Sequence, residues 1–153
     1  MFRLDVWQFN RMLTRRLLLW SAGSIAAGSA LMALGDPFWR SFGVQAVGWG
    51  AIDAAIAVAG RRGSERKQPA VAANPGLAAV EKDKLARLLW LNAGLDVLYI
   101  LGGLILARGI RRAPAHRPAA ERRGHGWGIV TQGAFLLLFD LWHAVAILDT
   151  EDA

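Results

Sequence analysis

The chain contains no cysteine, which excludes disulfide bonds, thiolate nucleophiles and cysteine-ligated metals. It also has almost no charge in four windows of 19–23 residues, at 17–35, 41–60, 88–107 and 126–148. A helix that crosses the hydrocarbon core of a bilayer needs about 20 apolar residues. A soluble bundle would show a charged face in each window, and none does. The sequence predicts an all-α polytopic membrane protein with four transmembrane helices in a bundle; a soluble four-helix protein is the less favoured alternative.

Helix-starting signals divide the chain, which we interpret as one domain over residues 1–153. Asp-Pro at 36–37 and Asn-Pro at 74–75 are typical of an N-cap followed by the first helical residue. Together with the windows they predict four helices, near 17–35, 38–60, 86–108 and 127–148. The charged segments with glycine and proline between them, 61–74 and 108–126, predict exposed loops. The amphipathic stretch 3–16 is expected either to extend the first helix outward or to form its solvated end.

Basic residues suggest an orientation. With four spans, the two termini and the middle loop share one side of the membrane, and that side collects eleven of the 18 Arg and Lys residues. The positive-inside rule then favours both termini in the cytoplasm. Six arginines between Arg108 and Arg123 fall on the other side and argue against this orientation.

Two apolar segments share one polar pattern. "QAVGWGAIDAAIAVA" begins at Gln45, and "QGAFLLLFDLWHAVA" begins at Gln132. Each places an aspartate eight residues after its glutamine, Asp53 in the first segment and Asp140 in the second. Matches of alanine and leucine are common by chance in apolar sequence, but an amide and an acid in register are not.

A second alignment extends this pattern to the other helices. Setting Arg16 on Arg87 aligns "RLLLWSAG" with "RLLWLNAG". We therefore predict two tandem two-helix repeats, about 5–62 and about 75–149. A duplicated pair of spans keeps its orientation, so the copies would be related by a pseudo-two-fold axis along the membrane normal.

Three runs carry a resemblance to a known family: "FWRSFGVQAVGWGAID", "LLWLNAGLDVLYILGG" and "QGAFLLLFDLWHA". In these runs the chain resembles a family of small four-helix bacterial integral membrane proteins carried as a domain of unknown function. The resemblance covers nearly the whole chain. It implies a bacterial inner membrane and four spans, and it supplies no activity, cofactor or catalytic residue.

Polar side chains inside the apolar windows are the candidate functional residues. They are Gln45, Asp53, Asn92, Asp96, Tyr99, Gln132, Asp140 and His143. A carboxylate at the bilayer centre costs about 2.5–3.5 kcal/mol, and no Lys or Arg lies in any window. We therefore expect Asp140 to carry a proton at neutral pH and to point inward with His143 beside it. Each glutamine lies roughly 12 Å along the helix from its own aspartate, so it should bond to a neighbouring helix.

The favoured interpretation is that these side chains are interhelical glue in a structural or accessory membrane protein. Buried amides and protonated acids hydrogen-bond across helices and fix which helices meet. Small residues, Ala22, Ala26 and Ala30 with Gly48 and Gly50, are expected to let helices approach closely. The alternative is a polar cavity at the midplane, which would serve a proton- or cation-coupled transporter or channel working as a homodimer.

A membrane-embedded enzyme is the least favoured class. The chain has no paired nucleophile, no glycine-rich phosphate loop and no metal-spaced His/Glu cluster, so we expect no catalytic residue, cofactor or metal. His116 and His125 fall in a basic segment and are expected to be solvated. The expected partners are the lipid bilayer and either a second copy or a larger membrane complex, for which seven tryptophans leave room as a lateral face. Nucleic acid is not expected, because the basic runs are most simply charges facing lipid phosphates.

Overall fold

The computed structural model describes residues 5–72, 74, 76–109 and 118–150. Four long helices make up nearly all of it: α1 (Val6–Ala33), α2 (Pro37–Ala72), α3 (Gly76–Arg108) and α4 (Ala119–Ala146). A single 3-10 turn, η1 (Ile147–Asp149), follows α4. Each helix is long and apolar enough to cross a membrane, and only 22–33% of its most apolar window is buried inside the protein. The prediction of an all-α chain with four long apolar helices is confirmed.

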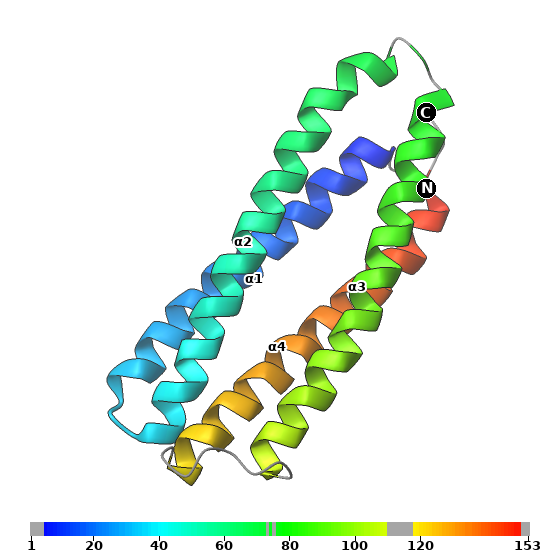
Figure 1. Ribbon diagram of the computed structural model, residues 1–153. Coiled ribbons are helices and arrows are strands. Elements are labelled where there is room, and N and C mark those ends of the chain that lie inside the picture. Colours follow the sequence, from blue (N-terminus) through cyan, green and yellow to red (C-terminus); the bar gives the residue numbers. More distant parts are fainter. Residues whose placement is uncertain (1–4, 73, 75, 110–117, 151–153) are drawn as a thin grey trace.

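The helices are arranged as two hairpins (Figure 1). α1 packs along α2, α3 packs along α4, and contacts between α2 and α4 join the hairpins. α1 begins and α4 ends at the same end of the bundle as the α2–α3 connection. The α1–α2 turn, the end of α3 and the start of α4 lie at the opposite end. Both ends of the described chain therefore lie on one side, as the count of spans requires.

Capping side chains define where the first two helices begin. Asp5 Oδ1 accepts a hydrogen bond from the Gln8 backbone N at 2.7 Å, so α1 begins well before the charge-free window. Asp36 Oδ1 accepts from the backbone N of Phe38 at 2.9 Å and of Trp39 at 3.2 Å. The predicted start of the second helix at Asp36 is confirmed. Gly35, at φ 78°, makes the tight turn before it.

The predicted loop at 61–74 is wrong, because α2 continues as a helix to Ala72. The segment consists largely of Arg, Glu, Lys, Gln and Ala, which are strong helix formers. An ion pair one turn apart supports it, with Arg61 Nε 2.8 Å from Glu65 Oε1. Pro69 lies inside this helix, where water can replace the lost backbone bond because the segment is exposed. The loop predicted over 108–126 is also too long, since α4 begins at Ala119.

Close approach through small residues holds the helices together. A Cβ on Gly28 would lie 2.7 Å from the Gly43 carbonyl oxygen between α1 and α2. A Cβ on Gly128 would lie 2.7 Å from Gln45 Cβ between α4 and α2. Such spacing lets backbones approach and gives dispersion contacts that do not depend on water.

Two of the predicted small-residue contacts are wrong. Ala22, Ala26 and Ala30 are exposed, and no described atom lies within 4 Å of a Cβ built on Gly48. Gly50 does face α1, where its Cβ would meet the carbonyl oxygen of Ser21. The four-residue spacing of the alanines did not identify a packed face, because the apolar outside of a bundle can carry the same spacing.

One interhelical contact recurs in both hairpins. In the first hairpin, Gly43 on α2 lies against Met32 on α1. A Cβ built on Gly43 would be 2.9 Å from Met32 Cγ. The two alignments carry these positions to Val130 and Gly103, which also meet, with Val130 Cγ2 2.9 Å from a Cβ built on Gly103. The helices of both pairs therefore cross at the same register. The internal repeat stays a prediction, and this shared crossing supports it.

Candidate functional site

Three acidic side chains from three helices converge near the middle of the bundle. Asp53 on α2 and Asp96 on α3 are each 3% exposed, and Asp140 on α4 is 7% exposed. All three line one cavity of about 200 Å³, together with Asn92 and Tyr99 of α3. Five of the eight predicted polar residues are therefore neighbours in space, although they come from distant parts of the chain.

The carboxyl groups of the three acids satisfy only part of one another's hydrogen-bonding capacity. The carboxyl groups of Asp96 and Asp140 lie within hydrogen-bonding reach. An ionised carboxylate can only accept, so this bond requires a proton on one of the two. Oδ2 of Asp53 and Oδ2 of Asp96 are buried without a hydrogen-bond partner among the described residues. Buried polar atoms are nearly always paired, so these two oxygens mark a place for a proton or a small ligand.

The remaining wall of the cavity is apolar. It is formed by Leu17, Trp49, Ile52, Ile56, Leu95 and Leu136. None of the described lining residues is Lys or Arg. Across the described ranges, no group of three or more His, Cys, Asp or Glu side chains has an arrangement that could hold a metal ion. Carboxyl groups in such a wall can accept hydrogen bonds and, when protonated, donate them.

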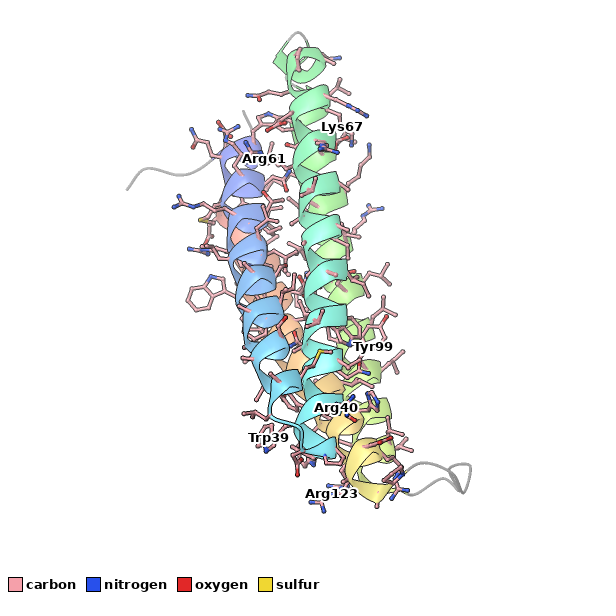
Figure 2. The ribbon with its side chains drawn as sticks, turned by 90° about the vertical axis from the view of Figure 1, so that its left-hand side faces the viewer. Trp39, Arg40, Arg61, Lys67, Tyr99 and Arg123 are labelled. Atoms are coloured by element: carbon pink, nitrogen blue, oxygen red, sulfur yellow. The ribbon has the colours of Figure 1, made fainter. Side chains whose placement is uncertain are left out.

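The cavity is lined in part by α2 and α3, which have few contacts with each other. Two of its lining residues, Ile56 on α2 and Tyr99 on α3, are 53% and 40% exposed. The Tyr99 ring packs edge-on against Trp49, with ring centroids 4.8 Å apart. Figure 2 shows Tyr99 between two basic ends of the bundle, one marked by Lys67 and the other by Arg123.

His143 is buried but does not line the acid cavity. Its Nδ1 lies 2.7 Å from the Phe139 carbonyl oxygen, and its Nε2 lies 3.2 Å from Arg16 Nη1. A carbonyl only accepts, so Nδ1 donates, and Nε2 is left to accept from the guanidinium. The ring also packs edge-on against Phe9 of α1, at 5.9 Å. His143 and Asp140 both point inward, but they face different neighbours.

The two glutamines bond to other helices. Gln45 Nε2 lies 3.0 Å from Nδ1 of His125, and Gln132 Oε1 accepts from Trp20 Nε1 at 3.2 Å. Neither glutamine lines the acid cavity. The expectation that His125 is solvated is wrong, because this residue is half-buried on α4. His116, the other histidine expected to be solvated, lies outside the described residues.

Sequence reasoning missed the contact of Arg16 with His143. Arg16 stands just before the first apolar window, and no prediction from the sequence paired it with a buried side chain. Its guanidinium lies 3.2 Å from the buried ring of His143 on α4, although Arg16 as a whole is exposed. The signal available in the sequence was a basic residue next to a span in a chain with one histidine inside the spans.

Comparison with known proteins gives one match. Residues 16–141 match the model of a family described as "Family of unknown function (DUF6992)". The matched region covers most of both hairpins and all three acids of the cavity, and it ends two residues before His143. No curated protein and no solved structure matches the chain.

Proposed function

The chain belongs to the Family of unknown function (DUF6992), and we propose that it is a multi-pass membrane protein that binds and exchanges protons at Asp53, Asp96 and Asp140. In this proposal it works as a small proton-coupled transporter or channel. No catalytic step and no cofactor form part of the proposal. The proposed location is the bacterial inner membrane, with both termini on the cytoplasmic side.

Membrane insertion is supported by the length and the surface of the helices. All four are apolar enough to span a bilayer, and many large apolar side chains on them are exposed, such as Leu91 at 62% and Leu138 at 69%. Charged residues gather at the two ends of the bundle, as Arg61 and Arg40 show in Figure 2. The excess of Arg and Lys on the side of the termini supports the cytoplasmic orientation.

The observation that carries the proton proposal is the pair of buried, unpartnered carboxyl oxygens in the cavity. A carboxyl group that served only as glue would be expected to bond across helices with both oxygens. Asp53 and Asp96 each leave Oδ2 unpaired among the described residues, at 3% exposure. Intramembrane acids that face a cavity are typical of proton relays. Within the cavity, the reach of Asp96 to Asp140 gives a bond that forms or breaks with one proton.

Structural glue is the second candidate, and the glutamines favour it. Gln45 bonds from α2 to α4, and Gln132 bonds from α4 to α1, so the two amides tie three helices together. In that case the protein would be an accessory subunit, and the acids would add to the same network. The two functions differ in what happens when an acid is replaced by its amide.

Proton flux in liposomes separates these candidates. The purified protein is reconstituted, a pH gradient is imposed, and the internal pH is followed with a fluorescent dye. Wild type should dissipate the gradient faster than empty liposomes. Asp140→Asn and Asp96→Asn should each remove this excess flux while leaving the fold intact, because an amide bonds without carrying a titratable proton. Asp83→Asn is the matched control, since Asp83 is an exposed aspartate on α3 outside the cavity. Flux that is unchanged in both cavity variants would leave only the structural function.

A further inference from the structure

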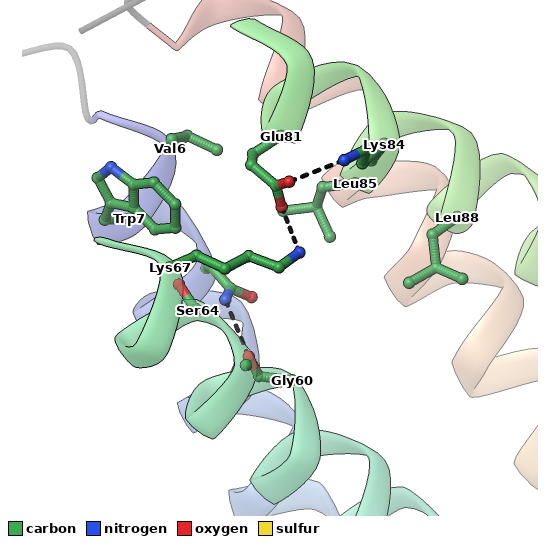
Figure 3. Close-up of a pocket in the computed structure, with 11 residues that line it drawn as sticks. Val6, Trp7, Gly60, Ser64, Lys67, Glu81, Lys84, Leu85 and Leu88 are labelled. Atoms are coloured by element: carbon green, nitrogen blue, oxygen red, sulfur yellow. Dashed lines mark hydrogen bonds and ion pairs between the residues drawn. The ribbon is translucent and has the colours of Figure 1, made fainter. Parts of the chain in front are cut away.

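A second cavity lies near the ends of α1, α2 and α3, on the side where the described chain begins and ends (Figure 3). Its volume is about 240 Å³, which is roughly eight times the share of one water molecule in the liquid. It is separate from the acid cavity, because the two cavities share no lining residue. Its lining combines charged, polar and apolar side chains.

Two lysines stand on opposite sides of one glutamate at this cavity. Lys67 Nζ on α2 lies 2.7 Å from Glu81 Oε2, and Lys84 Nζ on α3 lies 3.0 Å from Glu81 Oε1. The hydrogen bond from Lys67 does most to lower the pKa of Glu81, and Lys84 adds to it, so the carboxylate is ionised at neutral pH. The group of three then carries one net positive charge. Each ammonium has three N–H donors, so each keeps two beyond its bond to Glu81.

The lysines are exposed, whereas the glutamate is shielded. The side chains of Lys67 and Lys84 are 54% and 63% exposed, against 19% for Glu81. An anion that approaches the cavity therefore meets the ammonium groups before it meets the carboxylate. Ser64 also lines the cavity, and a serine hydroxyl is a donor that a phosphate oxygen can use.

Apolar side chains from two helices also line the cavity, and one of them stands where a charge-free window begins. Val6 and Trp7 of α1 and Leu85 and Leu88 of α3 line the cavity. Leu88 is the first residue of the third window. The cavity thus spans the boundary between apolar helix and basic helix end, which in a membrane is the level of the lipid headgroups.

We propose that this cavity binds a phosphate group through Lys67, Lys84 and Ser64, as the headgroup of an anionic phospholipid whose acyl chain follows Leu85 and Leu88. Basic pockets between helices at a membrane surface are suited to such headgroups. A free phosphate would use the same donors but would not use the leucines. The proposal is independent of proton binding at the acid cavity.

The test measures lipid binding to the full chain in a neutral detergent. Short-chain phosphatidic acid, short-chain phosphatidylcholine and inorganic phosphate are each titrated, and binding is read by native mass spectrometry and by the shift in melting temperature. Phosphatidic acid should bind, phosphatidylcholine should bind less, and inorganic phosphate should bind least. Equal binding of phosphatidic acid and inorganic phosphate would support a phosphate site but identify the free anion as the source.

Three variants give effects of different sign. Lys67→Gln combined with Lys84→Gln should weaken phosphatidic acid by roughly 30-fold, on the scale of about fivefold for each basic residue near an anionic headgroup. Glu81→Gln should tighten it, because both lysines are released and the net charge rises from one to two. Arg61→Gln is the control: it removes a charge at the same end of the bundle, from a residue that pairs with Glu65 and does not line the cavity.

Three results would overturn the proposal. The first is a double lysine variant that remains folded and binds phosphatidic acid as wild type does. The second is an equal loss of binding in Arg61→Gln, which would mean that diffuse surface charge attracts the lipid. Tighter binding by Glu81→Gln remains a readout even if the double variant fails to fold, and weaker binding by Glu81→Gln would contradict the proposed role of the lysines.

Discussion

Gly102 and Gly103 are adjacent on α3, and replacing each with alanine tests the packing of the second hairpin. A Cβ on Gly103 would lie 2.8 Å from the Gly126 carbonyl oxygen and 3.1 Å from the Val130 backbone N. No described atom lies within 4 Å of a Cβ built on Gly102. Gly103→Ala therefore forces α3 and α4 apart by several tenths of an ångström, whereas Gly102→Ala forces nothing.

The two substitutions should have different effects on the free energy of unfolding. Overpacking costs about 1–3 kcal/mol, and alanine in a helix recovers up to about 1 kcal/mol relative to glycine. Gly103→Ala should thus destabilise the protein by about 1–2 kcal/mol, and Gly102→Ala should be neutral or stabilise it by up to about 1 kcal/mol. Titration with a denaturing detergent, followed by circular dichroism and tryptophan fluorescence, measures both. Equal stability of the two variants would refute the close approach of α3 and α4.

Three further predictions follow from the contacts. The chain has no cysteine of its own, so single cysteines can be placed at Arg40 and at Gln68. They should react with an impermeant thiol reagent from opposite sides of the membrane. Labelling of both from the same side would contradict the hairpin arrangement. Glu81→Gln should lower the melting temperature at neutral pH. The pKa of Glu81 is lower in the folded protein than the ordinary glutamate value, so its ionised carboxylate stabilises the fold at neutral pH. That stabilisation is lost only as the pH falls below the ordinary glutamate range. If the melting temperature of Glu81→Gln stayed equally far below that of wild type in acid, ionised Glu81 would not be the source of the stability. Gln132→Leu and Trp20→Phe should show a coupling of about 0.6 kcal/mol in a double-mutant cycle, and additive effects would mean that their bond contributes nothing.

The helices could be predicted from the sequence because apolar length and capping are local signals. Asp36 was identified as an N-cap from its position before a proline, and its two backbone bonds bear this out. The helical segment 61–72 could not be predicted from the same rules, because glycine and proline were taken as breakers. Its other residues are strong helix formers, and they decide the structure where no packing opposes them.

The acid cavity could be predicted only in part. Burial of Asp53, Asp96 and Asp140 follows from their position in apolar windows, since an acid cannot face lipid cheaply. Which of them meet depends on how the hairpins dock, and the sequence carries no local signal for that. Asp140 and His143 illustrate the difficulty. They lie three residues apart, about 60° around one helix. That angle lets the two side chains contact different neighbouring helices.

The most direct test of the proton proposal is an infrared titration of the protein in lipid, from alkaline to acidic buffer. We expect a protonated-carboxyl band that changes across the titration and that both Asp96→Asn and Asp140→Asn alter, because the carboxyl groups of these two acids lie within hydrogen-bonding reach of each other. Asp83→Asn, on the exposed part of α3, should leave that band unchanged. A band that does not change with pH, or that neither cavity variant alters, would contradict proton exchange at this site.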